Sequence, residues 1–162
     1  TEDQALKIMD FMREAGQLAL TKRRTIRVDI DISNPGAPVL RMADNSGATD
    51  ILAKRIPLEP FKDVRMDVAP TGVVVPAPPN YAIAPFSAGV WTLRFKSDGS
   101  VVNAAGIPIS GTLLLWPPKK VPYDSTDLTS RSKVEIRAIT IFGGSGAVRY
   151  WKHDGTTFVP FQ

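Results

Sequence analysis

The chain has 162 residues, of which 43% are hydrophobic and 22% charged, and this composition fits one globular domain with a sizeable core. It has no cysteine and one histidine, His153, so disulfides, thiolate catalysis and a multi-histidine metal site within one chain are excluded. The net charge of +4 permits attraction to acidic polymers or membranes but does not establish it.

Residues 3–22 are the only segment that predicts a long helix. Asp3 lies in its first turn and Lys22, Arg23 and Arg24 close it, as the helix dipole favours. The pattern predicts a helix that packs on a core, in preference to a membrane-surface helix. Apolar residues recur at spacings of three and four, at Ala5, Ile8, Met9, Met12, Ala15, Ala19 and Leu20, and Phe11 and Leu18 widen the stripe.

Alternating apolar and polar residues over 25–32 predict a half-buried strand. Asp29 and Asp31 fall on its polar face, where solvation is favoured over a cation site. Residues 38–42 predict a second strand that pairs with the first, and 43–50 a loop. Residues 51–55 are ambiguous, whereas the alternation over 64–68 resembles a strand.

Prolines interrupt every apolar run of residues 70–89, which predicts irregular backbone or a sheet edge. A packed surface loop is favoured there over a proline-rich motif for SH3-type partners. Further strands are expected at 90–96 and 112–116, with an exposed loop over 119–133. Asp124 and Asp127 in that loop are interpreted as solvated, because two aspartates do not supply the oxygens that calcium needs.

A three-stranded antiparallel meander is predicted for Val134–Phe161. Gly143–Gly146 and Asp154-Gly155 supply its reversals. Ala147, Arg149 and Trp151 should share one face, and Val148, Tyr150 and Lys152 the other. His153 is expected to be solvent-exposed at a strand end, so its replacement should matter little.

No phosphate-binding loop and no serine nucleophile motif occur in the chain. We therefore expect no enzyme, with no catalytic, cofactor-binding or metal-binding residues, no cofactor and no small-molecule substrate. The basic cluster of Lys22, Arg23, Arg24 and Arg27 could contact nucleic acid, but a basic helix end is the plainer interpretation.

One helix followed by antiparallel strands resembles the GspH/FimT family of type IV pilin-like minor pseudopilins. In the helix, Ala15, Ala19 and Leu20 match the family's small residues, whereas Gly16 stands where an arginine is usual. The segment from Leu93 to Ser100 resembles the family's hydrophobic strand with a Phe-x-x-Asp-Gly-Ser turn. Residues 137–141, 146–151 and 154–155 resemble its closing pattern.

The resemblance implies an α+β, pilin-like fold in a single domain over 1–162, with the C-terminal half of the pilin helix at 1–24 and a β-rich head at 25–162. It implies a structural subunit of a type II secretion pseudopilus or a type IV pilus, which contacts other pilins through its helix. The head would be periplasmic, anchored in the inner membrane by a leader-bearing apolar segment that we expect before Thr1. DNA binding in DNA uptake is the alternative, and a partly exposed helix stripe is expected to suit filament packing.

Overall fold

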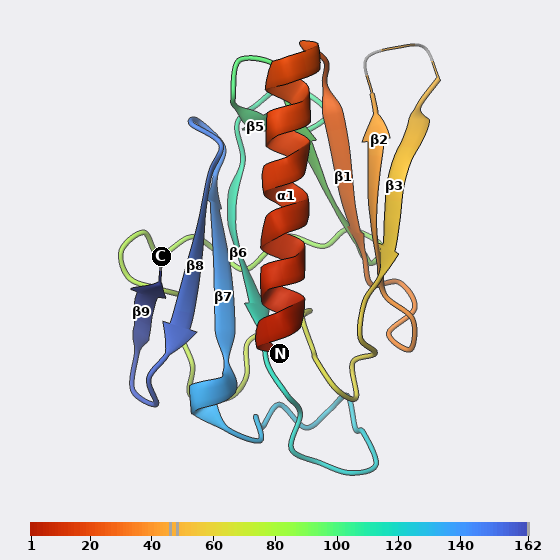
Figure 1. Ribbon diagram of the computed structural model, residues 1–162. Coiled ribbons are helices and arrows are strands. Elements are labelled where there is room, and N and C mark those ends of the chain that lie inside the picture. The colour runs from red at the N-terminus through yellow and green to blue at the C-terminus, as the bar shows by residue number, and fades with distance from the viewer. Residues whose placement is uncertain (46, 48, 162) are drawn as a thin grey trace.

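One long helix and two antiparallel sheets make up the computed structural model, which describes residues 1–45, 47 and 49–161 (Figure 1). The predicted α+β class is confirmed, with an N-terminal helix packed on antiparallel sheets. Two positions of the predicted 43–50 loop, Ser46 and Ala48, lie outside the described residues.

Helix α1 spans Glu2–Lys22 and ends as the sequence predicts. Arg23 takes the left-handed conformation at the C-terminus, with φ 52°, and its N–H bonds to the Ala19 carbonyl. The apolar stripe lies on the inner side of the helix. The buried residues of α1 are Gln4, Ala5, Ile8, Met9, Phe11, Met12, Ala15 and Ala19.

The first sheet has five strands in the order β3-β2-β1-β4-β5. The predicted pairing of the first two strands is confirmed, with Ile30 opposite Leu40. On its other side, β1 pairs with β4, so that Ile30 also lies opposite Trp91. The strands are β1 (Ile26–Asp31), β2 (Val39–Asp44), β3 (Ile51–Pro57), β4 (Val90–Phe95) and β5 (Val101–Val102).

The second sheet has four strands in the order β6-β7-β8-β9 and contains the predicted closing meander. Its strands are β6 (Ser110–Leu115), β7 (Arg137–Phe142), β8 (Ala147–His153) and β9 (Phe158–Phe161). Both faces of β8 contribute to cores: Tyr150 packs in the main core and Trp151 in a smaller one on the outer face.

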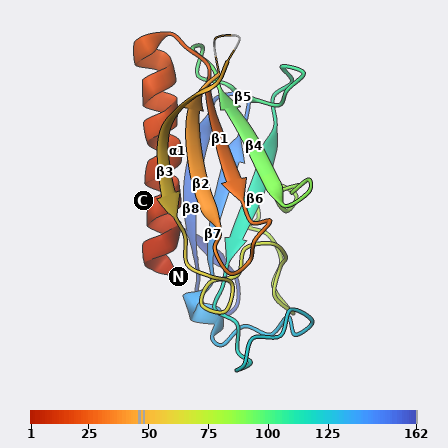
Figure 2. The same ribbon diagram turned by 90° about the vertical axis from the view of Figure 1, so that its right-hand side faces the viewer.

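The helix lies along the open side between the two sheets (Figures 1 and 2). It contacts β1 and β4 of the first sheet and β7 and β8 of the second. On the opposite side the two sheets come close together. There, Gly111 of β6 lies directly under the Trp91 ring of β4. The helix therefore bridges both sheets, rather than covering one face of the sheet that holds the meander.

Several predictions of local structure were wrong. Residues 64–68 form no strand, because Phe61–Asp63 make a turn after Pro60 and Arg65 then forms only an isolated bridge to Trp116. Residues 133–135 form a short 3-10 helix, η1 (Lys133–Glu135), where the first meander strand was expected to begin. Ala43 and Asp44 belong to β2 rather than to a loop, and the ambiguous residues 51–55 belong to β3.

Candidate functional site

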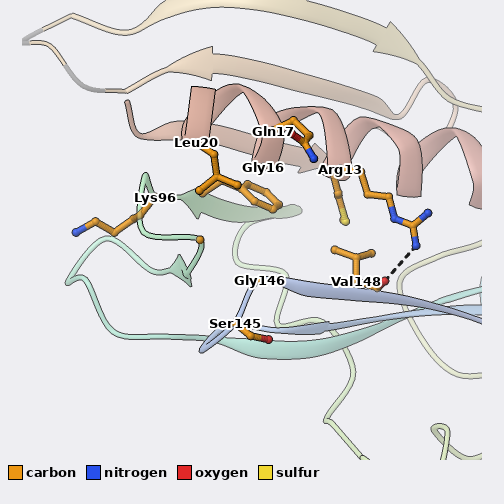
Figure 3. Close-up of a pocket in the computed structure, with 11 residues that line it drawn as sticks. Arg13, Gly16, Gln17, Leu20, Lys96, Ser145, Gly146 and Val148 are labelled. Carbon is orange, nitrogen blue, oxygen red and sulfur yellow. Dashed lines mark hydrogen bonds between the residues drawn. The ribbon is translucent and has the colours of Figure 1, made fainter. Parts of the chain in front are cut away.

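A groove runs between the C-terminal half of α1 and two loops, one from each sheet (Figure 3). Its volume is about 340 Å³. The helix supplies Met12, Arg13, Gly16, Gln17 and Leu20 on one side. The β4–β5 turn and the β7–β8 hairpin supply the other residues: Phe95, Lys96, Gly99, Ser145, Gly146 and Val148.

Two glycines line this groove. A Cβ on Gly16 would lie 3.6 Å from the Phe95 ring, which is ordinary van der Waals contact. Gly146 has φ +73°, and a Cβ there would overlap the Gly99 carbonyl. The Val101 N–H also bonds to the Gly143 carbonyl at 2.8 Å. The two loops are thus locked together and form a fixed wall opposite the helix.

Cations surround the groove and the adjacent helix end. Arg13 donates a 3.4 Å hydrogen bond to the Val148 carbonyl across the groove (Figure 3). Among the described residues, Arg13, Lys22, Arg23 and Lys96 have no carboxylate within ion-pair distance. The remainder of the predicted basic cluster is paired, because Arg24 contacts Asp44 at 3.2 Å and Arg27 pairs with Asp50. Lys22 lies in the last turn of α1 and Arg23 takes the cap position, so both lie at the helix end.

The helix offers little apolar surface for assembly. The expected exposure of the stripe is found only at the C-terminal end of the helix, where Leu20 is 49% exposed, whereas Ala5, Ile8, Met9, Phe11, Met12, Ala15 and Ala19 are buried. The outward face is polar, with Asp3, Lys7, Asp10, Glu14 and Gln17 exposed. The apolar stripe instead stabilises the head by burial.

The first turn of the helix is tied to the head. Gln4 is buried and accepts a 2.6 Å hydrogen bond from the Glu59 N–H. Glu2 pairs with Lys152 at 2.8 Å and accepts a 3.4 Å hydrogen bond from the Tyr150 hydroxyl. The hydrogen bond and the charge of Lys152 lower the pKa of Glu2. These contacts fix where the helix enters the head.

Asp29 is not a solvated carboxylate as predicted, since it is only 7% exposed. It accepts a 2.9 Å hydrogen bond from Thr92 and lies 3.2 Å from Arg27 and 3.8 Å from Arg41. Arg41 also contacts Asp31 at 2.8 Å. Arg27 of the same strand and Arg41 of the neighbouring strand β2 cover the carboxylates, so the polar face of the first sheet is a charge network.

Asp124 and Asp127 form local turns. Asp124 accepts hydrogen bonds from both the backbone and the hydroxyl of Thr126, and these hold the pKa of its carboxyl far below the usual range. Asp127 accepts from the Thr129 N–H at 3.0 Å. No group of three or more candidate ligands that could hold a metal occurs within residues 1–45, 47 and 49–161.

His153 is 6% exposed, so the prediction of a solvent-exposed histidine was wrong. Its Nδ1 accepts a 3.0 Å hydrogen bond from the Gly155 N–H, and its ring meets Phe158 edge-on at 4.9 Å between centroids. Burial lowers the pKa of His153. The neutral His153 ring thus holds the last turn of the meander in place.

Across the described residues, we find no helix both long and apolar enough to cross a lipid bilayer. Comparisons with protein-family models, curated proteins and solved structures gave no significant match. The groove was not predicted from the sequence, because its residues come from segments far apart in the chain. Its one local signal is the pair of turn glycines, Gly99 and Gly146.

Proposed function

We propose that the chain is the periplasmic head of a minor pseudopilin of the GspH/FimT type, a structural subunit of a type II secretion pseudopilus or a related pilus. The observation that carries this proposal is the position of α1 against the two sheets. One N-terminal helix lies along two antiparallel sheets and buries a stripe centred on Ile8, Met12 and Ala15 against both.

The position of the first helical turn supports this proposal. The loops that extend beyond this turn lie to one side of the helix axis in Figure 2. A helix that continued before Glu2 would leave the head along this axis. Because Gln4 and Glu2 are bonded to the head, the direction of such an extension would be fixed.

In this proposal, the segment before Thr1 supplies the inner-membrane anchor and the helix contacts with other pilins. Such an anchor needs about 20 apolar residues. The buried stripe of α1 is used within the subunit, so the head itself would meet its neighbours through other surfaces, with the groove beside Leu20 as a candidate. Contacts of this kind between different surfaces build open helical filaments.

The coding sequence upstream of Thr1 tests this proposal. We expect a short basic leader, a Gly-Phe-Thr-Leu-x-Glu junction and an apolar segment. When the full-length chain is expressed with a prepilin peptidase, mass spectrometry should show loss of the leader and gain of one N-methyl group. A globular domain upstream, or a mass unchanged by an active peptidase, would refute it.

A second candidate is a pilin-like DNA-binding protein in DNA uptake. It is favoured by four cations around the groove and the helix end, Arg13, Lys22, Arg23 and Lys96, that have no described carboxylate within ion-pair distance. Phosphate contacts by such cations make affinity fall with salt.

Gel-shift titration with duplex DNA at increasing salt tests this second candidate. Replacing both Arg23 and Lys96 by Gln should weaken binding and reduce the salt slope by about 1 for each cation that binds a phosphate. Arg55→Gln is the control, because Arg55 is an exposed cation on the edge strand β3 that does not line the groove. No binding at low salt, or an equal weakening in both variants, would argue against this role.

A further inference from the structure

The outer face of the second sheet is covered only in part. At one end, segment 68–83 packs over it and encloses Leu114, Trp116, Ala138 and Trp151. At the other end, toward the β7–β8 hairpin, the face carries a second groove of about 380 Å³. Its lining residues are Pro78, Pro79, Tyr81, Thr140, Phe142, Ser145, Ala147 and Arg149.

Strand register brings these side chains together. Phe142 lies opposite Ala147, and Thr140 lies opposite Arg149, so all four share one face of β7 and β8. Tyr81 is held beside this face because its carbonyl accepts a 2.8 Å hydrogen bond from the Thr112 hydroxyl of β6. The groove is therefore built on rigid strands.

The aromatic rings supply apolar contact surface. Tyr81 and Phe142 are stacked, with centroids 6.2 Å apart and planes inclined by 11°. Phe142 remains 45% exposed, although the same face is closed over Trp151 further along. An exposed aromatic ring beside two proline rings suits a ligand that has an apolar ring face of its own.

The groove also holds polar groups without partners, and these determine which polar groups of a ligand it can bind. Within the described chain, neither the Arg149 guanidinium nor the Tyr81 hydroxyl has a hydrogen bond or an ion pair. A guanidinium binds a carboxylate through two parallel hydrogen bonds. The backbone groups of β7 and β8 are engaged in their ladders, so the groove does not offer the free sheet edge that an extended peptide would use.

We propose that this groove binds an acidic saccharide, with a sugar ring on Tyr81 and Phe142 and its carboxylate on Arg149. The stacked rings supply apolar contact with the sugar face, and the hydroxyls of Tyr81 and Ser145 are placed to exchange hydrogen bonds with sugar hydroxyls. The proposal goes beyond the filament role and does not depend on it.

Titration of the ¹⁵N-labelled protein with tri-galacturonate, followed by NMR, tests the proposal. We expect saturable shifts centred on Phe142 and Arg149 and much weaker binding of neutral galactotriose. Arg149→Gln should weaken tri-galacturonate binding at least tenfold, as should Phe142→Ala. Arg55→Gln and Phe161→Ala, which alter an exposed arginine and an exposed aromatic ring outside this groove, should leave it unchanged.

Three results would overturn the proposal. These are the absence of shifts at 10 mM tri-galacturonate in a folded sample, equal binding of the neutral trisaccharide, and an equal weakening in the groove variants and their controls. An oligo-dT titration runs in parallel, because base stacking and phosphate contacts use similar side chains. Binding of oligo-dT alone, abolished in Arg149→Gln, would assign the groove to single-stranded nucleic acid instead.

Discussion

At the scale of single residues, His153 is the position where local pattern and structure differ most. A histidine beside an Asp-Gly turn has the sequence context of an exposed residue, yet its backbone N–H bonds to the Ile136 carbonyl and its ring contacts Phe158. We expect His153→Ala to lower the free energy of unfolding by about 1–3 kcal/mol, because alanine can neither accept the Gly155 hydrogen bond nor pack against Phe158. Urea unfolding monitored by circular dichroism measures this.

The same residue predicts a pH dependence. Burial lowers the pKa of His153, so the folded state binds its proton less readily than the unfolded chain does. The stability supplied by the neutral ring should be complete above an unfolded pKa of about 6.5 and be lost as pH falls through the lower folded pKa. The stability difference between wild type and His153→Ala should therefore shrink from pH 7.5 to pH 5. An equal difference at both pH values would contradict this.

Asp29 shows why the fate of a charged residue could not be predicted from one strand. The alternation of residues 25–32 correctly places Asp29 away from Ile30, but burial depends on what lies beside it. Arg27 comes from the same strand, whereas Arg41 and Thr92 come from neighbours on either side. Only the pairing of β1 with both β2 and β4 assembles this network.

At the scale of elements, strands with one buried face could be predicted, whereas the exposed edge strand β3 could not. Trp91, Leu93 and Phe95 alternate and are buried, as predicted for β4. Strand β3 is exposed on both faces over most of its length, so no alternation marks it. The alternation over residues 64–68 does not mark a strand with one buried face. Arg65, a polar position of that pattern, is itself buried against Trp116 with a cation–π contact at 5.5 Å.

Replacement by alanine should have opposite effects at two glycines that line the groove beside α1. Gly16 lies within α1, and its Cβ would make ordinary contact with Phe95, so Gly16→Ala should stabilise the protein by about 0.5–1 kcal/mol. Gly146 has φ +73° and lies against the Gly99 carbonyl, so Gly146→Ala should destabilise it by about 1–3 kcal/mol. Urea midpoints of the two variants measure both effects. An unchanged midpoint for Gly146→Ala would show that the two loops are not locked together.

At the scale of the whole molecule, the helix and the meander could be predicted, but not how they meet. β1 and β4 pair although they lie far apart in the sequence, as Ile30 and Trp91 show. No local pattern encodes that pairing, and it places the helix between two sheets instead of on one. The groove beside α1 depends on this arrangement, whereas the second groove depends on how residues 78–81 lie beside β7 and β8. Neither Arg13 nor Arg149 was therefore predicted as a site residue.

Because α1 bridges the two sheets, they should unfold together. Ile8 is fully buried in the core shared by the helix and both sheets. Ile8→Ala should cost about 2–4 kcal/mol through reduced burial and the cavity left behind. If the helix couples the sheets, native-state hydrogen exchange should accelerate by the same factor in β1 and β7, and tryptophan fluorescence and circular dichroism should give coincident unfolding curves.

Leu114→Ala is the matched comparison, because Leu114 is fully buried in the smaller core on the outer face of the second sheet, away from the helix. If the two sheets unfold together, Leu114→Ala should accelerate hydrogen exchange in β1 as well, because the slowest-exchanging amides exchange only through global unfolding. Acceleration confined to the second sheet, or two separate unfolding transitions in Ile8→Ala, would show that the sheets are independent. The helix would then be a cover on only one of them.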